Sequence, residues 1–169
     1  MISGKNTVLR AWEESDITSL HSLRNDVSLQ QQLMSRPQAN SIEQVRQWLK
    51  SKTTLSDSVF FVIAGKQQNK IVGYLQVVSI DLLNGTGKLG ICLLPEEQGK
   101  GYGSEAIDLL QQYLVEVFNI RKLFLEVLKS NNRAHSLYTK LGFQECGCLH
   151  KHFYINKCFD DVLIMEKIF

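Results

Sequence analysis

Proline is scarce in this sequence, and long apolar runs are missing. The 169 residues include only 2 prolines, Pro37 and Pro95, and no repeat, low-complexity stretch or long linker divides the chain. No segment approaches the roughly 20 apolar residues that span a bilayer, and the first seven residues form no apolar leader. We therefore expect one domain over residues 1–169 that is soluble and cytoplasmic and has no membrane partner.

Cysteine is also sparse, and neither sign of charge dominates. Lys and Arg total 19 against 17 for Asp and Glu, without the long basic run that duplex nucleic acid requires, so we expect no nucleic-acid partner. Four cysteines are too few for the disulfide framework of a secreted domain. We expect reduced, buried thiols at Cys92, Cys146, Cys148 and Cys158.

The hydrophobic pattern predicts an α/β domain. Apolar spacings of three and four predict helices that begin near Asp16, at Ser41, after Gly103 and near Ala134, with a loop around Pro37 between the first two. Ser15 or Asp16 is expected to cap the first helix. The pattern implies one mixed, mostly antiparallel sheet of about seven strands flanked by about four helices. The strands are expected at residues 7–12, 59–64, 71–78, 87–94, 122–128, 144–155 and 159–168.

A glycine-rich turn lies between a strand and a helix at residues 93–104. Gly99, Gly101 and Gly103 let the backbone approach an anion, and the N–H groups and dipole at the start of the helix attract negative charge. Lys100 adds a full positive charge. The spacing matches neither a Walker A loop nor the dinucleotide-binding fingerprint. The turn predicts phosphate binding, although alone it is compatible with a purely structural turn.

Two segments together resemble the GCN5-related N-acetyltransferase (GNAT) superfamily. The first is Gln-x-x-Gly-x-Gly at residues 98–103, and the second is Asn-x-x-Ala-x-x-x-Tyr-x-x-x-Gly-Phe at residues 131–143. The order of the predicted elements is similar to that fold over nearly the whole chain. The resemblance implies an acetyl-CoA-dependent N-acetyltransferase in which two central strands splay apart to admit CoA. Pro95, which lacks an N–H group, is consistent with such a splay.

The resemblance also assigns roles to individual residues. The glycine turn would bind the pyrophosphate of acetyl-CoA, Asn131 the pantetheine arm, and Tyr138 would lie near the thioester sulfur. A free backbone N–H between Ile91 and Leu94 is expected to stabilise the oxyanion. The implied cofactor-binding residues are Ile91, Cys92, Leu93, Gln98, Gly99, Lys100, Gly101, Tyr102, Gly103, Ser104, Asn131, Arg133, Ala134 and Tyr138.

The reaction needs a proton acceptor and a proton donor. An alkylamine is mostly ammonium at neutral pH, so it must lose a proton before it attacks a thioester, and the departing thiolate gains one. Glu126, twelve residues before Tyr138, resembles the base of N-terminal-amine acetyltransferases, and Tyr138 their acid. On a buried strand Glu126 would be the stronger base. The alternatives are that Glu126 meets a lysine across the sheet or that water relays the proton.

The acceptor is expected to be a primary amine on a small molecule, such as a nucleotide-linked amino sugar, or a protein N-terminal amine. Both ends of the chain are similar to the ribosomal-protein-alanine acetyltransferase-like branch. A polyamine acceptor and a non-catalytic CoA-sensing module are the alternatives, and the oligomeric state stays open, a homodimer included. Acceptor-site candidates are Arg24, Asn25, Trp48, Tyr74 and Tyr154.

A metal site is conceivable near the end of the chain. The four residues Cys146, Cys148, His150 and His152 alternate along one face of a predicted strand. Residues two apart on a strand are separated by about 6.6 Å, so four ligands spread over about 20 Å cannot converge on one zinc ion. A Cys–His nucleophile would lack a third, orienting group. We therefore expect no metal and no covalent enzyme intermediate.

Overall fold

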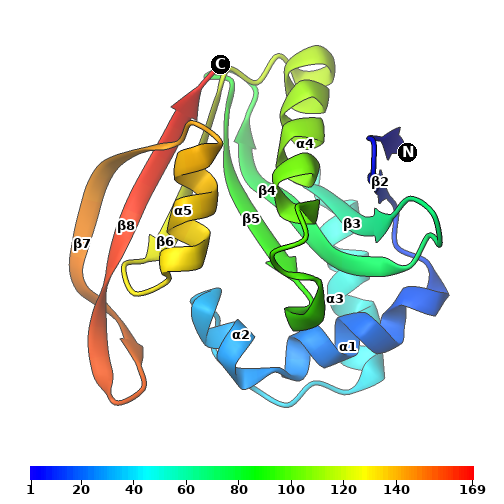
Figure 1. Ribbon diagram of the computed structural model, residues 1–169, viewed down its shortest axis with the longest axis horizontal. Coiled ribbons are helices and arrows are strands. Elements are labelled where there is room, and N and C mark those ends of the chain that lie inside the picture. Colours follow the sequence, from blue (N-terminus) through cyan, green and yellow to red (C-terminus); the bar gives the residue numbers. More distant parts are fainter.

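The computed structural model describes residues 1–169 as one eight-stranded sheet with five α-helices (Figure 1). The sheet order is β1-β2-β3-β4-β5-β6-β8-β7, and every neighbouring pair is antiparallel except β5–β6. The elements are β1 (Ile2–Ser3), β2 (Thr7–Arg10), α1 (Ile17–Asn25), α2 (Val27–Gln32), α3 (Ile42–Thr54), β3 (Val59–Gly65), β4 (Ile71–Asp81), β5 (Thr86–Leu93), α4 (Tyr102–Phe118), β6 (Lys122–Leu128), α5 (Asn132–Lys140), β7 (Gln144–Ile155) and β8 (Cys158–Ile168).

The predicted fold class is confirmed, with two additional elements. β1 has 2 residues and α2 has 6, which is too short for hydrophobic periodicity to reveal either. α2 occupies part of the segment before Pro37 that was expected to be a loop. It begins at Asp26, whose side chain accepts a hydrogen bond of 2.9 Å from the Leu29 N–H. That cap was the one sequence signal that could have revealed α2.

The helix starts agree with the sequence in one case and differ in another. Ser41 and Gln44 form the reciprocal capping box that begins α3, with hydrogen bonds of 2.7 and 3.2 Å. Asp16 does not cap α1. Its carboxylate instead binds the Arg10 guanidinium through two hydrogen bonds of 2.7 and 2.9 Å, in a pair that is almost fully buried. Asp16 therefore fastens the start of α1 to β2.

Two hydrophobic cores lie on opposite faces of the sheet. α4 supplies one with Ile107, Leu110 and Leu114, which pack against inward-facing residues of β2, β4 and β6. α1, α2 and α3 supply the other with residues such as Leu20 and Leu49, which pack against β3 and β4. Figure 1 shows α4 and α5 over one face, with the first helices gathered at one end of the sheet. None of these helices combines the length and apolar character needed to cross a membrane.

The feature that positions a site is the divergence of β5 and β6. These parallel strands pair only at their first residues, from Thr86↔Lys122 to Lys88↔Phe124. β5 stays paired with β4 as far as Leu93, so the gap opens on the β6 side alone. The splayed central strand pair expected from the resemblance is present, and it opens toward α2 and α5 (Figure 1).

Candidate active site

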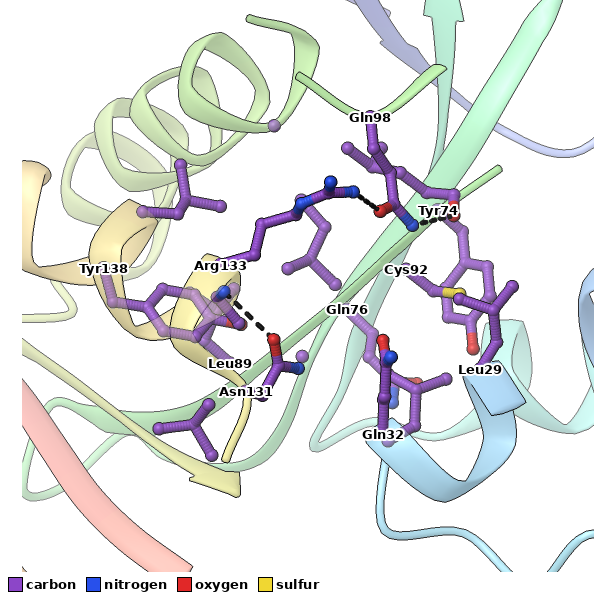
Figure 2. Close-up of a pocket in the computed structure, with 18 of the residues that line it drawn as sticks. Leu29, Gln32, Tyr74, Gln76, Leu89, Cys92, Gln98, Asn131, Arg133 and Tyr138 are labelled. Carbon is purple, nitrogen blue, oxygen red and sulfur yellow. Dashed lines mark hydrogen bonds between the residues drawn. The ribbon is translucent and has the colours of Figure 1, made fainter. Parts of the chain in front are cut away.

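The gap between β5 and β6 leads into a cavity of about 740 Å³. Its walls come from α1, α2 and α3, from β4, β5 and β6, from the glycine turn and from α5. Figure 2 shows Tyr138 on one side of this cavity, with Leu29 and Gln32 of the α2 helix on the other. The cavity thus brings together residues separated by more than one hundred positions in the sequence.

The glycine turn gives the cavity an open backbone surface. Gly99 and Gly101 have φ values of 80° and 89°, in the left-handed region that glycine tolerates best. No atom lies within 4 Å of the place where a Cβ would stand at either residue. Gly101 begins α4, and no side chain caps that helix, so its first N–H groups are available to a ligand. This surface fits a phosphate group.

Two polar side chains connect the glycine turn to α5. The Arg133 guanidinium donates to Oε1 of Gln98, whose Nε2 donates to the Leu93 carbonyl at 3.2 Å (Figure 2). Oδ1 of Asn131 accepts a hydrogen bond of 3.2 Å from the Ala134 N–H and so caps α5. These contacts bring the two motif segments, residues 98–103 and 131–143, together at the same end of the cavity.

The strand edge exposed by the gap carries hydrogen-bond donors. The Leu94 N–H donates to the Val72 carbonyl at 2.9 Å, on the β4 side. Because backbone groups alternate in direction along a strand, the N–H groups of Ile91 and Leu93 face the gap. An extended pantetheine arm and a thioester oxygen require such donors. The residues of the gap therefore fit CoA.

Tyr138 is the aromatic hydroxyl on the α5 side of the cavity. Its side chain is 6% exposed and packs edge-on against Phe143 at 5.8 Å between ring centroids. Burial raises the pKa of Tyr138 to about 12, so the hydroxyl is protonated at neutral pH. No protein group hydrogen-bonds to it, and it faces the cavity (Figure 2). The hydroxyl is therefore free to donate a proton.

Glu126 lines the cavity from β6, but not as a buried, isolated carboxylate. Its side chain is 33% exposed, and Oε2 lies 2.8 Å from Nζ of Lys88 on β5. Glu126 is therefore only half-buried, and it meets a lysine across the sheet, which was one of the alternatives expected for it. Both partners line the cavity, so a carboxylate is present within it.

Most of the residues assigned from the sequence line this one cavity, but four do not. Lys100 is exposed and pairs with Glu97 at 2.9 Å. Tyr102, the first residue of α4, packs against the hydrophobic core. Asn25 instead holds the segment after α2, because its side chain accepts from the Asn40 N–H at 2.8 Å. Tyr154 is 59% exposed and packs against Phe159 at the end of the β7–β8 hairpin. Asn25 and Tyr154 therefore do not line this cavity.

Sequence reasoning missed the wall formed by α2 and the residues that follow it. Leu29 and residues 32–35 line the cavity, as do Lys52 of α3, Gln76 of β4 and Lys88 of β5. None of these residues belongs to a motif. The place of Leu29 and residues 32–35 in the cavity depends on how α2 folds over the gap.

The four residues considered as zinc ligands do not converge. Only Cys148 and His150 approach each other, with Sγ and Nδ1 3.7 Å apart, and Asp161 joins them from β8. The Asp161 oxygen nearest His150 also lies 3.3 Å from Nζ of Lys129, so an ammonium already neutralises it. This cluster is not among the residues that line the cavity.

The cysteines differ from the expectation of buried thiols. Only Cys92 is buried, whereas Cys146 and Cys158 are exposed and Cys148 is half-buried. Burial raises the pKa of the Cys92 thiol to about 12, so it is neutral at physiological pH. The one cysteine in the cavity is therefore a poor nucleophile.

Comparison with known proteins agrees with this geometry. The family model of the acetyltransferase (GNAT) domain matches residues 6–144. A spermidine N(1)-acetyltransferase of Escherichia coli (strain K12) is 31% identical over 92% of this chain and 82% of its own, and the ribosomal-protein-serine acetyltransferase of the same strain is 25% identical over 95% and 91%. The crystal structure of spermidine N-acetyltransferase from Vibrio cholerae in complex with CoA and spermine superimposes with a TM-score of 0.89, at 26% identity, covering 98% of this chain and 96% of that one.

The chain belongs to the GNAT acetyltransferase family, and it is an N-acetyltransferase that uses acetyl-CoA as its co-substrate. The glycine turn, the gap beside β5 and Tyr138 accordingly form the candidate active site. The N-acetyltransferase activity expected from the sequence is confirmed at this level.

Proposed function

We propose that the chain transfers the acetyl group of acetyl-CoA directly to a primary amine while both substrates occupy the cavity. Tyr138 carries this proposal, because its side chain is buried and its hydroxyl is protonated and without a protein partner in the cavity. The neutral state of Cys92 further favours direct attack over a covalent acyl-enzyme. The acceptor is a small-molecule amine or a protein N-terminal amine.

In this mechanism the residues of the chain bind, polarise and move protons. The glycine turn and the start of α4 hold the phosphates, and the N–H groups of Ile91 and Leu93 stabilise the oxyanion. The Glu126 carboxylate receives the proton that the ammonium loses, directly or through water. The amine nitrogen then forms the C–N bond, the C–S bond breaks, and Tyr138 donates its proton to the departing sulfur. The nitrogen releases its second proton as the amide forms, and that proton returns to Tyr138 directly or through water.

Calorimetric titration with acetyl-CoA followed by a free-thiol release assay tests this proposal. The amines to compare are amino sugars, amino acids, polyamines and N-terminal peptides. We expect binding and turnover with one class. Binding without turnover on any class would instead support a CoA-sensing module. The names of the E. coli and V. cholerae relatives make a polyamine the second candidate acceptor.

A further inference from the structure

The charged residues that line the cavity are unevenly distributed. Glu126 is the only carboxylate among them, and Lys88 already pairs with it. Arg133 and Lys140 belong to α5, and Arg133 contacts Gln98 of the glycine turn. The opposite end, which we call the acceptor end, has two further cations and no carboxylate. It is formed by Arg24, Leu29, residues 32–35, Trp48, Lys52, Tyr74 and Gln76.

Arg24 at the acceptor end is held in place but left without an anion. Its guanidinium carbon lies 4.8 Å from the centroid of the Trp48 ring, a cation–π contact that fixes the side chain. The Arg24 Nε is fully buried and has no hydrogen-bond partner. A buried N–H without a partner is costly, and natural sites retain one where a ligand supplies the acceptor.

Lys52 reinforces the positive charge at the same end. It comes from α3, one helical turn after Trp48, and no carboxylate pairs with it. Burial lowers the pKa of Lys52 most, and the neighbouring Arg24 charge lowers it further, so the two cations lie close enough to repel each other. Asp26, on the segment between α1 and α2, is already used to cap α2. No carboxylate therefore forms an ion pair with Arg24 or Lys52.

We propose that the acceptor amine carries an anionic group, a carboxylate or a phosphate, that Arg24 and Lys52 bind at the acceptor end of the cavity. This inference rests on the proposed function and narrows its substrate class. An anion there would accept from the Arg24 guanidinium, which lacks any carboxylate partner, and would lie between two cations. A polyamine, which is polycationic at neutral pH, would place like charges beside the same pair and so be disfavoured.

Matched amines that differ only in the anionic group test the proposal. With acetyl-CoA saturating, kcat/KM is measured by thiol release for glucosamine 6-phosphate against glucosamine, for alanine against alaninamide, and for spermidine. We expect at least one anion-bearing amine to exceed both its neutral partner and spermidine by about tenfold or more, as charge-assisted hydrogen bonds imply. Which pair shows the preference distinguishes phosphate from carboxylate. Equal or better turnover of the neutral partners or of spermidine would overturn the proposal.

Variants separate the charge effect from damage to the fold. Arg24→Gln should remove most of the preference, Arg24→Lys should restore part of it, and acetyl-CoA affinity should stay unchanged in both. Lys50→Gln is the matched control, because Lys50 lies on the same helix as Lys52 but is exposed and outside the cavity. A preference that persists in Arg24→Gln would contradict the role of Arg24. Acetyl-CoA binding with no acetylation of any amine would refute the proposed function itself, which is a different outcome from loss of preference.

Discussion

The glycine-turn end and the acceptor end of the cavity present different chemical groups to a ligand. At the glycine turn the binding surface is backbone: two left-handed glycines, the uncapped start of α4 and the free edge of β5. At the acceptor end it is side chain, with Arg24, Lys52 and Trp48 contributed by two different helices. Backbone donors serve any chain that binds the same phosphates, whereas side chains can change with the acceptor. We infer that the glycine-turn end is common to the family, whereas the acceptor end differs with the substrate of the individual protein.

The largest effect on acetyl-CoA binding should come from a substitution that disrupts the glycine turn. Gly101→Val forces a β-branched residue into a φ of 89° and places its methyl groups in the open space above the turn. We expect acetyl-CoA binding, as measured by calorimetry, to be lost. Gly65→Ala is the control, since its Cβ would make only ordinary contacts and it lies outside the cavity. Unchanged affinity in Gly101→Val would mean that the turn does not hold the phosphates.

The next largest effect should appear at the proton donor on the α5 side of the cavity. Tyr138→Phe should lower kcat by about a hundredfold or more and leave acetyl-CoA affinity nearly unchanged. Because burial raises the pKa of Tyr138 to about 12, its neutral form persists as pH rises past 10. We therefore expect no loss of activity from ionisation of Tyr138 in the free enzyme between pH 8 and about 10. Tyr113→Phe, outside the cavity, should behave like the unaltered protein, and a fully active Tyr138→Phe would remove the tyrosine from the acid role.

A smaller effect should distinguish catalysis from structure at the Lys88–Glu126 pair. Glu126→Gln should lower kcat by about tenfold or more and move the acidic limb of the pH–rate profile, because the proton acceptor is gone. Lys88→Met breaks the same 2.8 Å contact from the other side and retains the carboxylate. If the pair is purely structural, the two variants will lose activity equally and the acidic limb will stay in place.

The same division explains how much the sequence could predict. The order of the elements along the chain followed from local hydrophobic patterns, whereas the splay of β5 and β6 and the role of Tyr138 were expected from the resemblance carried by two compact motifs. The residues of the acceptor end could be predicted from the sequence only in part. Arg24, Trp48 and Tyr74 do line the cavity, but α2 was missed because its six residues contain no full amphipathic repeat. Asn25 and Tyr154 lie outside the cavity, because their side chains contact Asn40 and Phe159 instead, and such tertiary contacts are not visible in the sequence.

The smallest effect should come from Lys100, the one cationic side chain of the glycine turn. Lys100 is exposed and pairs with Glu97 at 2.9 Å, and such surface pairs contribute about 1 kcal/mol or less. Lys100→Gln should therefore weaken acetyl-CoA binding by about threefold and flatten its salt dependence, whereas Glu97→Gln should strengthen binding slightly by releasing the ammonium. Calorimetry at two salt concentrations measures both. A hundredfold loss in Lys100→Gln would show that a side chain, rather than backbone N–H groups, dominates phosphate binding, and the contrast between the two ends would no longer hold.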